Sequence, residues 1–427
     1  MINTNANMKK TIGDGGFDGA FKQLYTDIAD ARSRYISLID GFSGYFGERD
    51  NLRLFSAPGR TELGGNHTDH QKGNVLAASV GNDIIAAVSE NDSHIIRIKS
   101  EGHEVVEVDL TDLNIKESEK EDANALVRGI SARMNELGYA VRGFDAYTTS
   151  RVLNASGMSS SAAFEILCCT IVNYLFANAE LSAVDMSLIS KYAENVYFGK
   201  PCGLLDQLAC SVGGIVAMDF KDDSHPAIEQ IKYDFESTGH VFYIINTRGN
   251  HGDLTYNYAD IPNEMRSVAA YFGKEVLGQC TKQQVMENIP QLRKVVSDRA
   301  ILRAVHFFND CELAKQEAQA LKQNKFDEFL YLIKKSGRSS YMYLQNIYSP
   351  DMPQIQDLSL ALMLSEEVLG EHGAFRVHGG GFAGTIQAFV PQDLAEVYVK
   401  TLDGVFGDGS CLCPHIRNIG STELKYN

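Results

Sequence analysis

The spacing of apolar side chains predicts several helices in the first half of the chain and a longer helical region in the second half. Apolar residues recur at helical spacing in residues 17–45, 124–137, 162–178 and 183–197, then through 261–344, 355–369 and 394–406. β-branched runs bounded by glycine, asparagine or aspartate predict strands at residues 52–55, 75–89, 95–99, 144–152, 211–219 and 241–246. Residues 375–390 predict two more strands around a cluster of glycines. The pattern as a whole predicts an α/β protein.

Length and charge limit the kinds of domain and partner to expect. The chain has 427 residues, 44% of them hydrophobic, which suffices for two or three domains of roughly 150 residues each. The polar run at residues 221–224 is the best candidate boundary, and it divides the chain into residues 1–220 and 221–427. A net charge of −16 argues against nucleic-acid binding, which needs a basic surface. The negative net charge does not argue against an anionic small ligand, because a local site can carry positive charge on an acidic protein.

Cysteine spacing and the length of the apolar runs indicate a reduced, cytoplasmic protein. The eight cysteines form no CxxC pair and no zinc-like group with histidine. Residues 1–10 are polar and no apolar run follows them, so we expect no secretory signal. The longest apolar segment, residues 166–177, is too short to span a bilayer. We therefore expect a cytoplasmic protein without a membrane partner.

Residues 57–70 are the stretch around which the rest of the chain is organised. They gather one arginine, one glutamate, one aspartate and two histidines around three glycines. Glycine lets the backbone approach a ligand closely, and polar groups held on such a backbone suit a sugar ring. The alternative is an ordinary polar loop between two strands.

A second informative stretch, residues 154–163, lies between a predicted strand and a predicted helix and reads Asn-Ala-Ser-Gly-Met-Ser-Ser-Ser-Ala-Ala. Small residues let backbone N–H groups converge on a phosphate, and the helix N-terminus adds about half a positive charge. The stretch is no Walker A loop, because no GK[ST] follows. A serine N-cap on a core helix is the alternative, but capping needs one serine rather than three in a row.

Two further stretches carry candidate chemistry. Residues 376–384 hold four glycines within six positions, which favours a ligand loop over a tight hairpin turn. Residues 200–207 place Asp206 in apolar surroundings, where a carboxylate needs a partner, and Arg60 is the natural candidate. Glu194, on the preceding predicted helix, is a candidate cation ligand, although an isolated helix acid is more often solvated. A structural ion pair is the alternative for Asp206.

With these four stretches in order, the chain resembles the GHMP small-molecule kinases, and among them the galactokinase family. The resemblance runs from about residue 46 to residue 390. Residues 60–69 resemble the family's sugar signature, 154–163 its phosphate loop and 376–384 its C-terminal glycine loop, and residues 336–349 resemble a further family stretch. The resemblance implies two α/β domains, a ribosomal-protein-S5-like N-terminal domain and a ferredoxin-like C-terminal domain with extra helices, and an active site between them.

The resemblance also implies roles for single residues. Asp206 would be the catalytic aspartate at the sugar's anomeric hydroxyl, with Arg60 beside it. His67, Asp69, Gly203 and Tyr258 would bind the sugar, and Ser161 and Glu194 would hold Mg²⁺. ATP would be bound through the two glycine-rich loops, by Ser156, Gly157, Met158, Ser159, Ser160, Ser161, Gly380 and Gly381.

The chain departs from the galactokinase pattern at two positions of the sugar signature. The family's glutamate before His67 is Asn66 here, and its asparagine nearer the start is Glu62. Three hypotheses follow. Glu62 contacts the hydroxyl that the usual glutamate holds, or Asn66 makes that contact itself because an amide both donates and accepts, or the sugar preference is altered.

The function implied is phosphorylation of galactose to galactose 1-phosphate by ATP, with Mg²⁺ as cofactor. One alternative is a GHMP kinase for another substrate such as N-acetylgalactosamine. The other is a catalytically silent sugar sensor, against which the intact Arg60 and Asp206 argue. We expect a monomer whose partners are a sugar and ATP.

Overall fold

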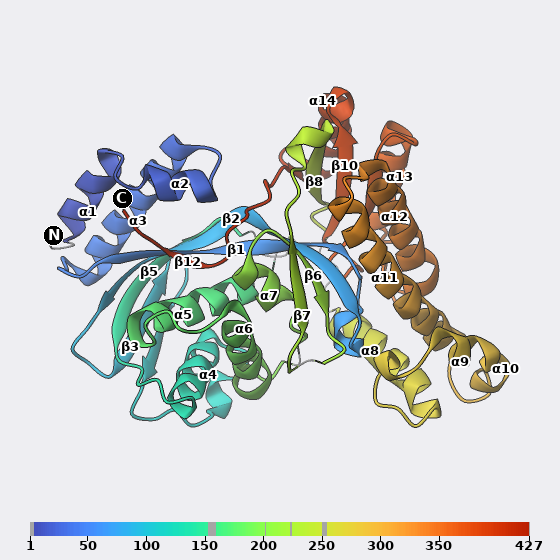
Figure 1. Ribbon diagram of the computed structural model, residues 1–427, viewed down its shortest axis with the longest axis horizontal. Helices are drawn as coiled ribbons and strands as arrows, with labels where there is room; N and C mark the ends of the chain where they lie inside the picture. The colour runs from blue at the N-terminus through green and yellow to red at the C-terminus, as the bar shows by residue number, and fades with distance from the viewer. Residues whose placement is uncertain (1–3, 153–158, 201, 223, 250–253, 427) are drawn as a thin grey trace.

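The computed structural model describes residues 4–152, 159–200, 202–222, 224–249 and 254–426. Its strands form two sheets, one of eight strands and one of four, with helices on both faces of the larger sheet (Figure 1). The mixed α/β architecture predicted from the apolar pattern is confirmed. No helix among the described residues combines the length and the apolar character needed to cross a bilayer.

The larger sheet has the strand order β12-β1-β2-β5-β3-β4, and β6 and β7 extend it from β2. Its described neighbours pair antiparallel except β3 and β5, which are parallel. The strands are β1 (Arg53–Gly64), β2 (Asn74–Glu90), β3 (Ile95–Ser100), β4 (Val105–Asp109), β5 (Phe144–Ser150), β6 (Ile215–Asp219), β7 (Ala227–Ile231) and β12 (Thr422–Leu424).

Two helical layers cover this sheet (Figure 1). The N-terminal layer holds α1 (Asn5–Gly13), α2 (Asp18–Leu24) and α3 (Ile28–Phe46). The layer on the other face holds α4 (Ala123–Glu136), α5 (Ser160–Phe176), α6 (Ala183–Tyr192) and α7 (Leu205–Val212). The single helix predicted at 17–45 is split, because Asp27 caps a new helix by accepting a hydrogen bond from the Asp30 amide at 3.0 Å.

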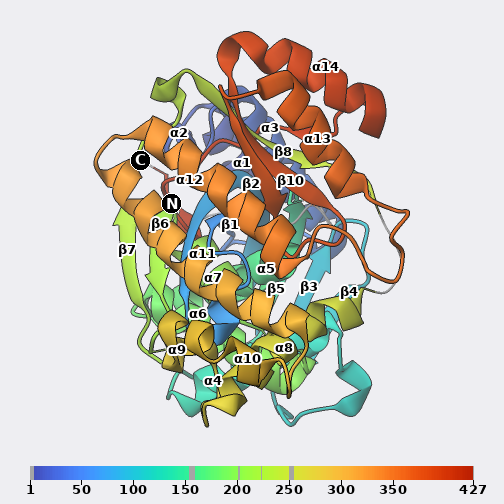
Figure 2. The ribbon, with the colours of Figure 1, turned by 90° about the vertical axis from the view of Figure 1, so that its right-hand side faces the viewer.

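The smaller sheet has the order β11-β8-β10-β9 and is antiparallel. Its strands are β8 (His240–Asn246), β9 (Ala374–His378), β10 (Thr385–Pro391) and β11 (Cys411–Leu412). The helices around it are α8 (Thr255–Tyr271), α9 (Lys282–Glu287), α10 (Ile289–Leu292), α11 (Asp298–Lys322), α12 (Phe326–Ser339), α13 (Asp357–Leu369) and α14 (Ala395–Phe406). α11 packs against β1 and β2 while its neighbour α12 packs against β9, so this helix pair joins the two sheets (Figure 2).

Short helical turns complete the structure. Two are π-turns, Ala193–Phe198 after α6 and Ser340–Leu344 after α12. The described 3₁₀ turns are Asp69–Gln71, Glu117–Glu119, Glu236–Thr238, Leu277–Gln279 and Gln392–Leu394. π-turns inside helices are frequent at functional sites.

The strand predicted at 52–55 is much longer in the structure. β1 continues through Gly64, so Arg60 and Glu62 lie in a strand and not in a loop. β2 pairs with this polar stretch, and the register shifts between Pro58 and Arg60, where a bulge accommodates the proline. Pairing with β2 satisfies the backbone, which the apolar pattern alone could not reveal.

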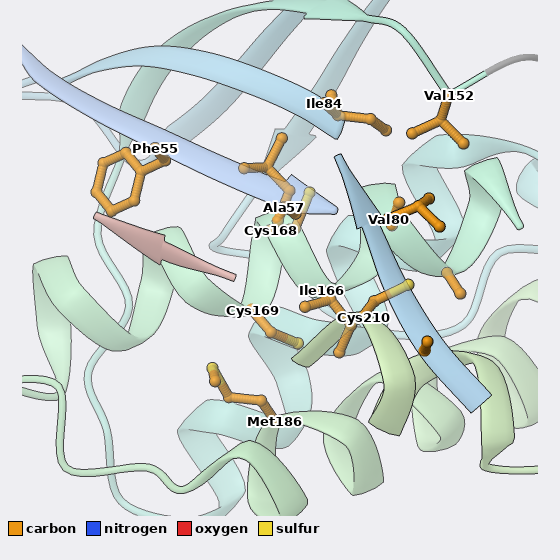
Figure 3. Packing of buried hydrophobic residues seen from close by; sticks show 14 of the residues in the cluster. Phe55, Ala57, Val80, Ile84, Val152, Ile166, Cys168, Cys169, Met186 and Cys210 are labelled. Atoms are coloured by element: carbon orange, nitrogen blue, oxygen red, sulfur yellow. The ribbon is translucent and has the colours of Figure 1, made fainter. Parts of the chain in front are cut away.

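The core of the first half lies between α5 and the strands above it. Figure 3 shows Ile166 and Cys168 of α5 beneath Ala57 of β1, with Val80 of β2 alongside. All four side chains are buried. This packing fixes where α5 begins relative to β1.

The larger sheet takes strands from both sides of residue 220, since β7 and β12 follow it in sequence. The C-terminal strand β12 returns to pair with β1 through Leu54 and Leu424. The division at residue 220 stays a prediction.

Candidate active site

Arg60 and Asp206, 146 positions apart, form an ion pair. The Arg60 Nε donates to Asp206 Oδ1 at 2.7 Å, and a terminal guanidinium nitrogen lies equally close. The Arg60 side chain is buried, whereas 34% of the Asp206 side chain is exposed. Asp206 therefore has the charged partner predicted for it and keeps a face open to a ligand.

Ser159 links the phosphate-loop stretch to this pair. It stands at the N-cap of α5 in a left-handed conformation with φ of 52°, and its hydroxyl donates to Asp206 Oδ2. Non-glycine residues with positive φ are uncommon and cluster at functional sites. Ser160 and Ser161 open α5, and Ser161 is exposed. Ser156, Gly157 and Met158 lie outside the described residues.

Asp69 and Gly203 meet on the other side of Asp206. A Cβ placed on Gly203 would lie 1.8 Å from Asp69 Oδ2, so only glycine fits there. Burial, with the negative charge of Asp206 as a second cause, raises the pKa of Asp69 to about 6. A carboxyl group with a raised pKa in contact with a charged neighbour is a functional-site candidate.

His67 and Tyr258 both contact the C-terminal glycine loop. The His67 Nε2 lies 2.9 Å from the Gly380 carbonyl oxygen, and the Tyr258 hydroxyl donates to the Gly381 carbonyl at 3.0 Å. Burial lowers the pKa of His67 to about 4, so the imidazole is neutral at pH 7. The sugar-signature stretch and the third glycine cluster, more than 300 positions apart, therefore lie side by side.

Glu62 and Asn66 are held in a buried polar network. The Asn66 amide nitrogen donates to Glu62 Oε1 at 2.9 Å and to the Gly379 carbonyl at 2.8 Å. Its amide oxygen accepts from Asn346 at 2.9 Å and from Ser340 at 3.3 Å. Asn66 is fully buried. Its side chain thus has protein partners for both amide hydrogens and for its oxygen.

Glu62 faces a guanidinium from the other sheet. Arg376 of β9 donates to Glu62 Oε1 at 2.7 Å, and both side chains are buried. Burial raises the pKa of Glu62 to about 7, although Arg376 opposes the shift. Contact of Glu62 or Asn66 with a sugar hydroxyl stays a prediction.

Two family models match the chain at these sites. The galactose-binding signature of galactokinases matches residues 40–90, and the N-terminal domain of GHMP kinases matches residues 124–214. The chain is therefore similar to galactokinases and to other GHMP kinases over these residues. The resemblance seen in the motifs is confirmed.

Curated galactokinases are similar to the chain along most of its length. A galactokinase from Glaesserella parasuis is 28% identical over 371 residues, which cover 84% of this chain and 91% of the relative. A galactokinase from Bacillus subtilis is 26% identical over 372 residues, covering 84% and 90% of the two chains.

Solved structures share the GHMP kinase fold. Lactococcus lactis galactokinase, complexed with galactose, matches with a TM-score of 0.78 and 22% identity, over 91% of this chain and 99% of that one. Methanococcus jannaschii mevalonate kinase matches with a TM-score of 0.60 and 15% identity, over 86% and 99%. The predicted GHMP fold is confirmed.

The predicted metal residue Glu194 lies on the π-turn Ala193–Phe198 and is buried. Burial raises the pKa of Glu194. Its Oε2 accepts from Gln207 Nε2 at 2.9 Å. The same nitrogen donates to Glu165 Oε2 at 3.2 Å, so two carboxylates share one amide. Within the described ranges, no group of three or more metal-ligating side chains is arranged around a common centre.

The sequence did not identify several residues of this site. Glu165 carried a signal, because it is a lone acid within the apolar helix α5, one turn after Ser161. Arg376 lay in a stretch singled out for its glycines only. Gln207, Ser340 and Asn346 lay in stretches singled out for other reasons, whereas Asp310 and Glu317 have no local signature.

Proposed function

We propose that the protein transfers the γ-phosphoryl group of ATP to the anomeric hydroxyl of galactose, giving galactose 1-phosphate and ADP. The observation that carries the proposal is the chain of contacts from Ser159 through Asp206 to Arg60. It joins the start of the phosphate-loop helix to the carboxylate that faces the sugar signature. The galactose-binding signature over residues 40–90 supports galactose as the sugar.

Asp206 and Arg60 act on the attacking alcohol. Asp206 Oδ1 and Oδ2 accept hydrogen bonds from Arg60 and Ser159, which hold the carboxylate in one orientation. In that orientation it accepts the proton of the anomeric hydroxyl as the new O–P bond forms and the bond to the β-phosphate oxygen breaks. The Arg60 guanidinium stabilises negative charge on the transferring group, since phosphoryl transfer depends on positioning and electrostatics.

The sugar is held by side chains from both sheets. Asp69 and His67 form hydrogen bonds with its hydroxyl groups. Gly203 contributes its backbone, and Tyr258 of α8 lies across from these residues. Glu62 and Asn66 form the polar network beneath this set. Contacts of His67 and Tyr258 with Gly380 and Gly381 couple sugar binding to the C-terminal glycine loop.

ATP binds where α5 begins. The N-terminus of α5 favours negative charge, and Ser159, Ser160 and Ser161 stand there. We expect Ser156, Gly157 and Met158 of the same stretch, together with Gly380 and Gly381, to bind the nucleotide. Ser161 and Glu194 would hold Mg²⁺, which would neutralise charge on the phosphates. In proteins Mg²⁺ is usually bound by one or two carboxylates together with substrate phosphates. The buried carboxylate of Glu194 is the one proposed here.

A second candidate is a kinase for another sugar, such as N-acetylgalactosamine. The specific observation in its favour is Asn66, which replaces an acid of the family pattern and has its amide taken up by protein. The silent sensor is the weaker alternative, because Arg60 and Asp206 are both present and paired. We also propose that the enzyme is a cytoplasmic monomer without a nucleic-acid or membrane partner.

The test is release of ADP measured over a panel of sugars with ATP and Mg²⁺. We expect galactose to give the highest kcat/KM. Asp206→Ala should lower kcat at least about a hundredfold, the low end for loss of a general base. Asp92→Ala, at an exposed aspartate far from the site, is the matched control and should keep full activity. Near-normal turnover by Asp206→Ala would remove this aspartate from the mechanism, and turnover with another sugar alone would favour the second candidate.

A further inference from the structure

One amide group holds two buried carboxylates beside Asp206. Gln207 Nε2 donates one hydrogen to Glu194 Oε2 at 2.9 Å and the other to Glu165 Oε2 at 3.2 Å. An amide nitrogen carries two hydrogens, and these two carboxylates are its nearer acceptors, with Cys202 Sγ at 3.7 Å as a third, longer contact. Glu165, Glu194 and Gln207 are 0%, 5% and 2% exposed. The bridge therefore lies in the interior, where each contact fixes its partners.

Two oxygens of this cluster have no hydrogen-bond partner among the described residues. They are Glu165 Oε1 and Gln207 Oε1. A buried polar atom left unsatisfied costs about 1–3 kcal/mol, so natural proteins keep few of them without a reason. The amide cannot turn over to relieve this, because its oxygen would then face two carboxylates. Its orientation is set by Glu165 and Glu194 together.

The charge balance around the bridge is negative. Asp206, which precedes Gln207 in α7, adds a third carboxylate next to Glu165 and Glu194. Asp206 itself is paired with Arg60, and Lys200 near the two glutamates is exposed. A group with more acids than cations suits a divalent ion.

We propose that Glu165 and Gln207 are positioning residues for the divalent cation, which rests on the proposed function of Glu194 as its ligand. Gln207 holds the Glu194 carboxylate at Oε2, and the Cys202 thiol contacts the same carboxylate, so the direction in which it faces is fixed. Glu165 takes the second amide hydrogen and so prevents Gln207 from rotating. Glu165 does this one helical turn after Ser161, which ties the orientation of Glu194 to the helix that begins the phosphate site.

The prediction concerns cation affinity, which can be measured without turnover. Free Mn²⁺ is followed by electron paramagnetic resonance in the presence of ADP and the full-length protein. Partners that orient a metal ligand typically contribute about 10–100-fold in metal affinity. We expect Glu165→Leu and Gln207→Leu each to raise the Mn²⁺ Kd at least about tenfold. Galactose binding in the absence of nucleotide should stay within about twofold of wild type.

Conservative variants separate a positioning role from direct ligation. Glu165→Gln keeps an oxygen that can accept from Gln207, so it should hold the Mn²⁺ Kd within about threefold of wild type. If Glu165→Gln weakened Mn²⁺ binding as much as Glu165→Leu does, the positioning role would be overturned, because the negative charge itself would then bind the ion.

A control separates this effect from general damage to the helix. Asn173→Leu removes a buried polar side chain from α5, where Asn173 bonds to Leu181 and lies away from the bridge. It should lower the Tm without changing Mn²⁺ affinity. If Gln207→Leu fails to fold, Gln207→Met is used in its place, because it removes the amide with little change in side-chain volume.

Two results keep this inference distinct from the proposed function. Wild-type Mn²⁺ affinity in folded Glu165→Leu and Gln207→Met would overturn the positioning role, even if galactose is phosphorylated normally. Tenfold weaker Mn²⁺ binding in these variants would support it, even if the ADP-release assay shows a different sugar as the substrate.

Discussion

Asp83 and Glu62 are buried carboxylates on neighbouring strands of the larger sheet, β2 and β1, yet their charge surroundings are opposite. Asp83 contacts two guanidiniums, those of Arg34 and Arg417, the latter at 3.1 Å. It also accepts from Tyr25 at 2.6 Å and from Ser56. Burial would raise the pKa of Asp83, but the two arginines outweigh it and hold the pKa below its usual value.

Glu62 is bonded to one arginine, Arg376, and the second cation near it, Arg60, is already paired with Asp206. Asp310 and Glu317 of α11 both lie close enough to act on the pKa values of this group, and both are fully buried. Neither Glu317 oxygen has a hydrogen-bond partner among the described residues. Burial raises the pKa of Glu317 well above its usual value. The Asp83 network is neutralised and clamps both chain ends to the sheet, whereas the Glu62 network keeps excess acid beneath the sugar signature.

The difference indicates what each network is for. A carboxylate with two guanidiniums and two hydroxyls is fully satisfied and can only hold structure together. Buried acids that have fewer cations than carboxylates around them raise the free energy of the folded state. Groups with such perturbed pKa values cluster at functional sites. Four variants or conditions test this contrast, beginning with the largest effect.

Asp83→Asn should lower the free energy of unfolding by about 3–5 kcal/mol, because it leaves two buried guanidiniums without a counter-charge. Urea unfolding measures the loss. Asp145→Asn is the matched control, since Asp145 is equally buried but its partners Arg49 and Arg97 are partly exposed and keep contact with water. We expect a clearly smaller loss there. A loss below about 1 kcal/mol for Asp83→Asn would contradict a clamping role.

The two networks should respond to pH with opposite signs. The Glu62 pKa rises on folding from 4.5 to about 7, so the folded state binds a proton more tightly. Its stability contribution is therefore fully present below about pH 4.5 and is lost as pH rises through 7, up to roughly 3 kcal/mol. Asp83 contributes above its unfolded pKa of 3.8, and that contribution is lost as pH falls.

Urea unfolding at pH 5 and pH 8 tests this, with Glu62→Gln as the variant. We expect wild type to lose stability between the two values and Glu62→Gln to lose less, because glutamine does not titrate. An equal decline in both proteins would show that Glu62 does not bind the proton.

The exchange of acid and amide at positions 62 and 66 should behave as a coupled pair. Asn66→Glu alone places a second carboxylate where the amide now donates to Glu62. We expect it to lower the free energy of unfolding by about 2 kcal/mol. Glu62→Asn combined with Asn66→Glu should recover at least half of that loss, since contacting residues are not additive. Unfolding of the two single variants and the double variant gives the coupling energy.

The same three proteins test sugar preference. We expect kcat/KM for galactose relative to N-acetylgalactosamine to change in the double variant if the network shapes the sugar site. An unchanged ratio would remove Asn66 from the specificity argument.

Asp69 should make sugar binding weaken in acid. Its pKa of about 6 means that the carboxylate, the form that accepts hydroxyl hydrogens, predominates above pH 6. KM for the sugar should rise by up to about tenfold per pH unit below that value. His67, with a pKa of about 4, stays neutral over this range and does not interfere. Asp69→Asn should show a higher KM that no longer varies between pH 5 and 8, and a persistent acid limb would assign the titration to another group.

Helices and strands followed from the sequence more closely than their ends did. Helices at 124–137 and 394–406 and strands at 144–152 and 241–246 are present with shifts of a few residues, because apolar periodicity is a local property. β1 was predicted to end nine residues too early, at Phe55 instead of Gly64, since nothing local indicates that β2 pairs with the polar stretch after Phe55. The pairing of Asp206 with Arg60 was predicted because an acid in apolar surroundings needs a cation, and Arg60 lies in the polar stretch 57–70.

By itself, the sequence determined the α/β class, the resemblance to GHMP kinases and the four stretches of candidate chemistry, all of which are encoded in neighbouring residues. Only the tertiary structure decided that Gln207 bridges Glu165 and Glu194, and that Arg376 reaches Glu62 across 314 positions. Burial and charge balance are properties of the packed interior. They arise from side chains that the chain brings together only on folding, so no spacing along the sequence reports them.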